Sequence, residues 1–175
     1  MRGVFTIEVV RTGEIHYRDH AVLDAIDGKI LKALQADGRI TITELAETVS
    51  LSKTPCTERV RRLEREGYIT GYRALIDPAH VGLDTLVFVQ VSLERTTTNV
   101  LDKFNAEVKR IPEVEAAHMI AGGFDYLLKV RARDMAHYRQ VLGDRIGALP
   151  GVSQTHTYAV METVMENGGI SPALF

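Results

Sequence analysis

The chain has 175 residues, a length that fits one mid-sized domain or two small ones. Its 21 lysines and arginines nearly balance 23 aspartates and glutamates, so the formal net charge of −2 excludes a strongly positive molecule, and any DNA site must be local. The single cysteine excludes an internal disulfide, and no pair of cysteine and histidine residues has metal-ligand spacing. No apolar run approaches the ~20 residues of a membrane-spanning helix. We therefore expect a cytoplasmic protein that carries no metal or other cofactor and contacts no membrane.

Residues 1–22 form a leader to which the sequence assigns no role. Phe5, Ile7 and Val9 alternate with polar residues, a pattern typical of a short strand. A disordered arm and a misplaced start of translation explain the segment equally well. The segment also lacks the basic start, apolar stretch and cleavage site of a secretion signal, so we expect no export.

Residues 23–73 are predicted to form a first domain of three helices. Apolar residues recur at spacings of three and four from Leu23 to Leu34, which predicts a helix. Asp37-Gly38 supplies the stop signal that ends it.

A second, short helix is predicted at residues 42–49, where Thr41 stands three residues before Glu44 in the spacing of a capping box. Ser50-Leu51-Ser52 then interrupts the pattern, and its last serine suits the N-cap of a third helix. Gly67 ends this third helix.

The third helix carries the features of a DNA-binding helix. Pro55 is tolerated in its first turn, and Val60 and Leu63 are its inward positions. Residues 23–73 hold nine basic side chains against eight acidic ones, whereas residues 74–175 hold nine against twelve. Two helices joined by a short turn, the second rich in arginine, predict a helix-turn-helix.

A domain boundary is predicted after this motif. Residues 72–76 read as an extended linker strand closed by Asp77-Pro78, and the linker itself spans residues 74–82. Residues 83–166 form the second domain, followed by a tail at residues 167–175. The second domain is predicted to run strand 86–93, helix 99–111, strand 114–121, strand 126–132, helix 135–149 and strand 152–161.

This βαββαβ order predicts a ferredoxin-like sandwich, in which two helices cover one face of a four-stranded sheet, so the fold class is α+β. Residues 122–125 supply a tight connection between the two central strands. The other sheet face stays open, and we expect some of Val87, Val89 and Val91 to lie on it. An open apolar face predicts dimerisation through the sheets.

An enzymatic function finds no support in the residue pattern. No nucleophile and base, and no pair of carboxylates, can be placed together by spacing, and the six histidines are scattered. His118, on the predicted strand 114–121, is the one histidine that we single out, and a packed or hydrogen-bonded role is the expected one there. We therefore predict that the protein is not an enzyme.

Three separated segments resemble the Lrp/AsnC family of regulators, and most closely its leucine-responsive branch. They are LSKTPCTERVRRLEREGYITGY (51–72), FDYLLKVRARDMAHYRQVL (124–142) and LPGVSQTHTYAVME (149–162). The resemblance implies a winged helix-turn-helix followed by an amino-acid-sensing ferredoxin-like domain of the RAM or ACT type. It also implies dimers that assemble into octamers or larger bodies, and control of the transcription of amino-acid metabolism.

The third helix must then supply two kinds of DNA contact, to base edges and to phosphates. The alternative is a solvated amphipathic helix with an attractive Glu58–Arg62 pair. Cys56 is expected to be a packed side chain rather than a redox sensor. For base edges we predict Thr54, Thr57, Glu58 and Arg61, and for the DNA backbone Lys53, Arg59, Arg62 and Arg65.

An amino-acid effector needs an anion for its ammonium, free amides for its carboxylate and an apolar wall. Glycines at 122 and 123 leave backbone amides open, and Asp125 suits the ammonium. By similarity, the family's cleft lies at this turn, between neighbouring dimers. The predicted effector residues are Met119, Ala121, Gly122, Gly123, Phe124, Asp125, Met135, Tyr158, Ala159 and Val160.

Two alternatives stay open at this site. The glycines and Asp125 also suit an ordinary hairpin turn. Leucine-responsive relatives carry an aspartate where this chain has Gly123, so proline or alanine is as suitable an effector as leucine. The same departure motivates a second function, that of an architectural DNA-wrapping protein of this fold without a small-molecule response.

Overall fold

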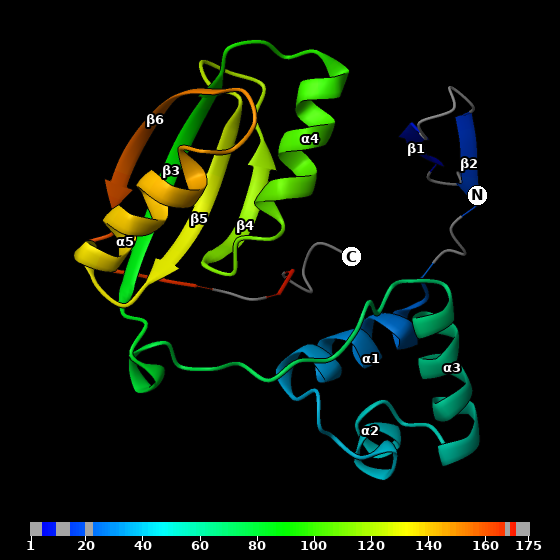
Figure 1. The fold of residues 1–175 in the computed structure, drawn as a ribbon. Coiled ribbons are helices and arrows are strands. Elements are labelled where there is room, and N and C mark those ends of the chain that lie inside the picture. Colours follow the sequence, from blue (N-terminus) through cyan, green and yellow to red (C-terminus); the bar gives the residue numbers. More distant parts are fainter. Residues whose placement is uncertain (1–4, 10–14, 20–22, 167–168, 171–175) are drawn as a thin grey trace. The chain divides into compact units, whose positions relative to one another are not determined.

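The computed structural model describes residues 5–9, 15–19, 23–166 and 169–170. The chain divides into two compact units, one made of residues 1–74 with 167–175 and the other of residues 75–166. Figure 1 shows the helices and strands of each unit along the chain.

Two short strands precede the helices. β1 (Phe5–Val9) pairs antiparallel with β2 (Ile15–Asp19), with Phe5 opposite Asp19. The strand predicted from Phe5, Ile7 and Val9 matches β1, whereas β2 was not predicted. The remaining residues of the leader lie outside the described residues.

The predicted helices of the first unit are α1 (Ala25–Ala36), α2 (Ile42–Thr48) and α3 (Lys53–Arg65). A capping box starts α2 as predicted, because the Thr41 amide donates to the Glu44 carboxylate at 3.0 Å and the Glu44 amide donates to the Thr41 hydroxyl at 3.3 Å. Asp24 and Asp27 form a second capping box at α1. The predicted Ser52 cap is wrong in one respect: Ser52 occupies the N-cap of α3, but its side chain accepts no hydrogen bond there.

The three helices enclose a small apolar core. Val60 and Leu63 point inward as predicted, and Cys56 is fully buried, which raises the pKa of its thiol. Ser50, in the turn between α2 and α3, has a φ of 59°, a left-handed conformation that sequence analysis did not anticipate. The core consists of Ile30, Leu45, Ala46, Val49, Cys56, Val60 and Leu63.

The linker strand predicted at residues 72–76 is wrong. The segment forms no strand and pairs with none of the described strands, and Leu75 and Ile76 are 84% and 65% exposed. Tyr72 is held instead by a hydrogen bond to the Glu64 carboxylate at 3.0 Å. A short 3₁₀ turn, η1 (Ala79–Val81), follows.

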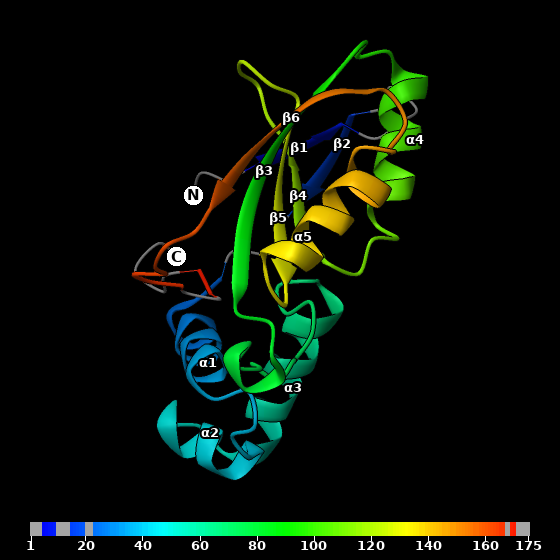
Figure 2. The ribbon, with the colours of Figure 1, turned by 60° about the vertical axis from the view of Figure 1, so that its left-hand side comes forward.

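The second unit has the predicted βαββαβ order. Its four strands form one antiparallel sheet in the order β4-β5-β3-β6, and Figures 1 and 2 show α4 and α5 on the same face of that sheet. The elements are β3 (Thr85–Leu93), α4 (Thr98–Val108), β4 (Val114–Met119), β5 (Tyr126–Ala132), α5 (Met135–Val141), the π-helical turn η2 (Leu142–Ile146) and β6 (Val152–Ala159).

Several predicted ends need correction. The strand expected to reach residue 121 stops at Met119, and the Ile120 amide closes the turn to β5 by donating to the Asp125 carbonyl at 2.9 Å. The helix expected over residues 135–149 is α5 followed by η2, whose wider turn is closed by the Gly147 amide bonded to the Leu142 carbonyl at 2.7 Å. The turn at residues 122–125 joins β5, a central strand, to β4, which is an edge strand.

The predicted faces of β3 are reversed. Val87, Val89 and Val91 are fully buried in the core beneath the helices, not on the open face. Alternation therefore places Phe88 and Gln90 on the open face, where Tyr158 of β6 donates a hydrogen bond to Gln90 at 3.2 Å. The correction keeps the open face but makes it less apolar than expected.

Candidate DNA and effector sites

The outer face of α3 carries one continuous stripe of exposed side chains. Thr54, Glu58, Arg61 and Arg65 repeat at spacings of four, three and four, so they share one face of the helix. Lys53 is also exposed, in the first turn. This face lies opposite the buried face of the helix. It carries both polar and positively charged groups, the kinds of group that contact base edges in the major groove of DNA.

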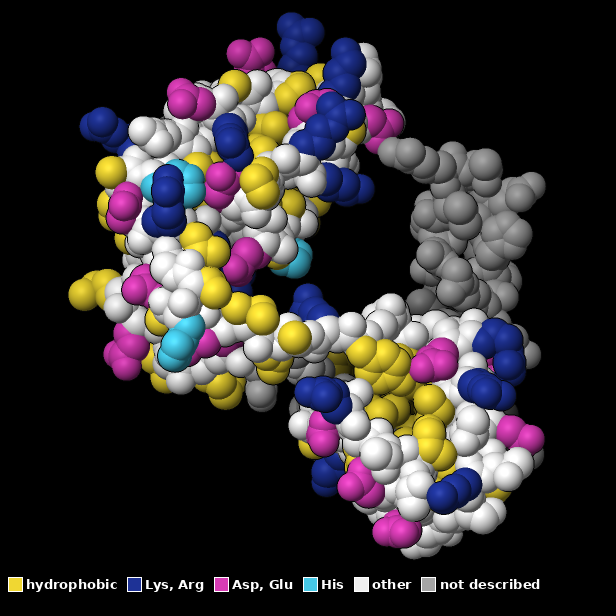
Figure 3. All heavy atoms as spheres, turned by 60° about the horizontal axis from the view of Figure 1, so that its bottom comes forward, with side chains coloured by type: hydrophobic (Ala, Val, Ile, Leu, Met, Phe, Trp, Pro, Cys, Tyr) yellow, Lys and Arg dark blue, Asp and Glu magenta, His cyan; other side chains and the backbone are white. Residues whose placement is uncertain are grey.

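The charge around this stripe is mixed. On the face of the helical unit that Figure 3 shows, basic and acidic side chains are interspersed, with hydrophobic side chains gathered between them. Thr57, another predicted base contact, is half-buried, and its hydroxyl donates to the Lys53 carbonyl at 2.8 Å. Five of the eight predicted DNA residues are therefore exposed, namely Lys53, Thr54, Glu58, Arg61 and Arg65.

Arg59 and Arg62 differ from the others because α1 holds them. Nη1 of Arg59 lies 2.6 Å from Oδ2 of Asp24 and 2.9 Å from Oδ1 of Asp27, and Nη2 of Arg62 lies 2.5 Å from Oδ2 of Asp27. These hydrogen bonds raise the pKa of both guanidinium groups. The Asp27 amide and then the Arg59 side chain lower the pKa of Asp24. Arg62 thus pairs with Asp27 rather than with Glu58.

Sequence reasoning missed Asp27 as a structural partner. The two aspartates have capping-box spacing, which was the available signal, but the contacts with Arg59 and Arg62 join residues 32 and 35 positions apart. No local pattern reports such a pair. Asp27 is the one buried charged residue among those that the structure describes.

The predicted effector turn is tied to the sheet through Asp125. Oδ2 of Asp125 accepts the Leu93 amide at 2.7 Å, and the Asp125 amide donates to the Val91 carbonyl at 3.0 Å. Gly122 and Gly123 do not have a positive φ, so the turn does not itself require glycine. A Cβ at Gly123 would meet no atom within 4 Å, so the backbone there is open to a ligand.

One chain does not bring the ten predicted effector residues together. Across the strands β5, β3 and β6, Tyr126, Val91 and Thr155 lie in one row, next to the turn. Val130, Val87 and Ala159 lie in another row, at the end of β6. The turn and β6's end are thus separated by about four residues, roughly 13 Å along the strands. Tyr158 and Ala159 end β6 and Val160 follows them, whereas Met135 begins α5 on the helical side of the sheet. The residues at the turn end are Met119, Ala121, Gly122, Gly123, Phe124 and Asp125.

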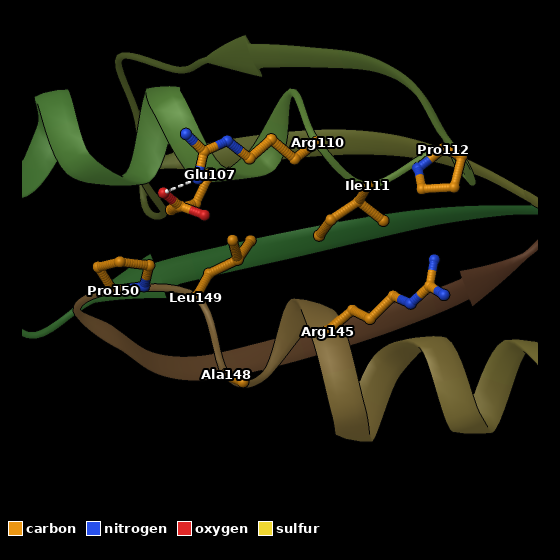
Figure 4. A pocket seen from close by; sticks show the side chains of 8 residues that line it. All are labelled: Glu107, Arg110, Ile111, Pro112, Arg145, Ala148, Leu149 and Pro150. Carbon is orange, nitrogen blue, oxygen red and sulfur yellow. Dashed lines mark hydrogen bonds and ion pairs between the residues drawn. The ribbon is translucent and has the colours of Figure 1, made fainter.

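A groove of about 630 Å³ lies elsewhere in the second unit, between the ends of α4 and η2 (Figure 4). Ile111 and Leu149 line it together with Arg110 and Arg145, but each arginine already pairs with a glutamate, Arg110 with Glu107 at 2.8 Å and Arg145 with Glu113 at 2.6 Å. None of the predicted effector residues lines this groove.

His118 is exposed on β4, and no group of three or more His, Cys, Asp or Glu side chains among the described residues is arranged to hold a metal ion. In the described part of the chain, no helix has the length and apolar character that crossing a membrane demands.

A three-helix unit with an exposed basic helix, followed by a ferredoxin-like unit, defines a two-domain DNA-binding regulator with a separate ligand-binding domain. Two family models match accordingly: the winged helix-turn-helix DNA-binding model matches residues 23–70, and the Lrp/AsnC ligand binding domain matches residues 86–170.

Curated relatives and solved structures agree. The proline dehydrogenase transcriptional activator of Rhizobium radiobacter is 51% identical over 146 residues, 83% of this chain and 94% of the relative. The leucine-responsive regulatory protein of Escherichia coli (strain K12) is 50% identical over 145 residues, 83% of this chain and 88% of the relative.

An AsnC family regulator from Agrobacterium tumefaciens superposes with a TM-score of 0.83 at 30% identity, over 87% of this chain and 99% of that one. A Neisseria meningitidis transcriptional regulator in complex with L-methionine superposes with a TM-score of 0.81 at 34% identity, over 85% of this chain and 96% of that one. The chain belongs to the Lrp/AsnC family of transcriptional regulators. The resemblance, the fold class and the regulatory function predicted from the sequence are thereby confirmed.

Proposed function

We propose that this regulator contacts DNA through the exposed stripe of α3 and responds to a small amino acid bound at the turn of residues 121–125. Residues 23–73 form the DNA-binding domain, residues 83–166 the effector and assembly domain, and residues 74–82 the linker. No role is proposed for residues 1–22 and 167–175. The observation that carries the DNA assignment is the stripe of Thr54, Glu58, Arg61 and Arg65.

Within this stripe we assign base contacts to Thr54, Glu58 and Arg61, with Thr57 beside them, and a phosphate contact to Arg65. Lys53, exposed in the first turn of α3, is assigned a second phosphate contact. An arginine that donates two hydrogen bonds to a guanine edge discriminates by about 1–3 kcal/mol. A phosphate contact carries no sequence information, but its loss lowers the salt dependence of binding.

The effector is proposed to be an amino acid because the turn presents open backbone next to a carboxylate, and because a relative of the same family was solved with L-methionine. Curated relatives named for leucine and for proline dehydrogenase keep both amino acids among the candidates. Since these relatives are transcriptional regulators, we assign the chain no catalytic activity and place it in the cytoplasm, where bacterial DNA lies.

Assembly completes the proposed effector site. The open face around Phe88 and Gln90 suits a second copy of the chain, which gives a dimer, and further assembly to an octamer would bring the turn of one subunit to the Tyr158 end of another. Such an arrangement accounts for the separation of the two residue groups along one sheet.

Two measurements test the proposal. A thermal-shift screen of the twenty amino acids should reveal the effector, because a ligand at a hundred times its dissociation constant adds about 2.7 kcal/mol of stability. Arg61→Ala should reduce discrimination between a selected duplex and its single-base variants, while Arg139→Ala, exposed on α5, serves as the matched control. No stabilisation by any amino acid would favour the architectural function, and full discrimination in Arg61→Ala would contradict the assignment of α3.

A further inference from the structure

The four charges that join α1 to α3 compensate one another. Asp27 is fully buried, both of its carboxylate oxygens accept from arginine, and Asp24 takes a second contact from Arg59. Two guanidinium groups and two carboxylates therefore form a cluster without net charge. A phosphate that approached Arg59 would also meet the Asp24 carboxylate, whose side chain is 50% exposed.

The helical positions of the two arginines agree with this inward role. At about 100° per residue, Arg62 lies roughly 70° and Arg59 roughly 130° around α3 from the centre of the exposed stripe. Both lie on the same flank, the one that faces α1, and only 29% and 30% of their side chains are exposed. Their guanidinium groups are thus directed to α1 rather than along the stripe.

We infer that Arg59 and Arg62 are positioning residues, held by Asp24 and Asp27, which fix α3 against α1 and make no phosphate contact. This inference rests on the proposed function, in which α3 is the DNA-contacting helix. It replaces the sequence-based assignment of both arginines to the DNA backbone. We call these four residues, Asp24, Asp27, Arg59 and Arg62, the clamp. By fixing α3 against α1, the clamp sets the direction in which the exposed stripe of α3 points.

The salt dependence of DNA binding separates the two roles. The logarithm of the DNA association constant falls linearly with the logarithm of the salt concentration. Each phosphate contact that is lost reduces the steepness of this fall, called the slope below, by about one unit. We expect Arg59→Gln and Arg62→Gln to leave this slope unchanged, and Arg65→Gln and Lys53→Gln, the matched controls on the same helix, to lower it by about one unit per bound subunit. The probe is a short duplex selected from a random pool, followed by fluorescence anisotropy with the full chain.

Arg59→Gln and Arg62→Gln leave Asp27 short of a partner, so either variant can fail to fold. A triple variant, Asp27→Leu with Arg59→Met and Arg62→Met, removes the buried carboxylate together with both of its arginine partners, and replacement of a whole ion-pair group by apolar residues is often neutral for stability. Its slope should equal that of the wild type, whereas two lost phosphate contacts would lower it by about two units.

A positioning role also predicts a change that a merely structural role would not cause. At a temperature where each variant is fully folded, the affinity ratio between the selected duplex and poly(dI-dC) should fall at least several-fold in Arg59→Gln, Arg62→Gln or the triple variant. A slope that falls by one unit for each arginine, or an unchanged ratio, overturns the inference. An unchanged slope in Arg65→Gln and Lys53→Gln overturns instead the DNA site proposed on α3, and with it the clamp's role.

Discussion

Substitution of Asp125 separates two roles that one carboxylate combines at the start of β5. Its Oδ2 accepts the Leu93 amide at 2.7 Å, and Leu93 is only 8% exposed. Asp125→Ala leaves that amide without an acceptor, which costs about 1–3 kcal/mol of folding free energy. Asp125→Asn keeps a carbonyl oxygen in the same position, so its folding free energy should fall much less.

The same asparagine removes the charge that we propose pairs with the effector's ammonium. Hydrogen bonds to charged groups contribute about 1.5–3 kcal/mol, so Asp125→Asn should weaken amino-acid binding about 10- to 150-fold. DNA binding should persist, since the helical unit is unchanged. Asp134→Asn is the matched control, because Asp134 caps α5 by accepting the His137 amide at 2.7 Å and asparagine caps equally well.

The assay is calorimetric titration with the amino acid that stabilises the wild type most, run beside urea denaturation of each variant. Asp125→Ala should lose both stability and affinity, Asp125→Asn mainly affinity, and Asp134→Asn neither. An affinity for the amino acid that is the same in Asp125→Asn and in the wild type would refute the proposed contact and leave Asp125 a strand-capping residue.

The remaining predictions concern assembly and pH. Phe88→Asp places a charge on the open sheet face, so this variant should sediment as a monomer in sedimentation velocity. Lys103→Asp, exposed on α4, should not change the assembly. A Phe88→Asp variant that is still a dimer at micromolar concentration would place the interface elsewhere. Burial opposes ionisation of Glu115, but hydrogen bonds from Arg131 and Lys129 outweigh it and lower the pKa of Glu115. The stability that this carboxylate contributes is therefore present above its pKa in the unfolded chain and is lost as the pH falls through its pKa in the folded protein. In a plot of unfolding free energy against pH, Glu115→Gln should make the decrease at acid pH less steep. An unchanged decrease would contradict the ion pairs.

Periodic patterns predicted the elements of both units well, because packing against the apolar core of each unit determines them. The spacing from Leu23 to Leu34 gave α1, and the strand predicted over residues 126–132 coincides with β5. The faces of β3 were misjudged although the sequence contained the answer. Gln90 and Ser92 share the parity of Phe88, so their polarity marks the open face and leaves the three valines for the core.

Contacts between distant residues were the part that sequence reasoning could not reach. Arg59 and Arg62 look like any other basic residues of a DNA-binding helix, and only the packing of α1 against α3 shows that Asp27 takes their charge. The hydrogen bond from the Leu93 amide to Asp125 spans 32 positions for the same reason. In both cases the missing information was a partner brought close by tertiary structure.

The proposed division of the effector site between the two ends of one sheet has a thermodynamic consequence. If the turn around Asp125 and the strand end around Tyr158 must come from different subunits, the effector binds the assembled state more tightly than the separate subunits. By linkage, the effector must then favour that assembly by the same factor. Assembly in turn sets how many α3 helices a single body presents to DNA, and linked DNA sites gain affinity without any new contact. Under the proposed assembly, an amino acid would therefore change DNA occupancy through the subunit interface, with no movement required inside the helix-turn-helix itself.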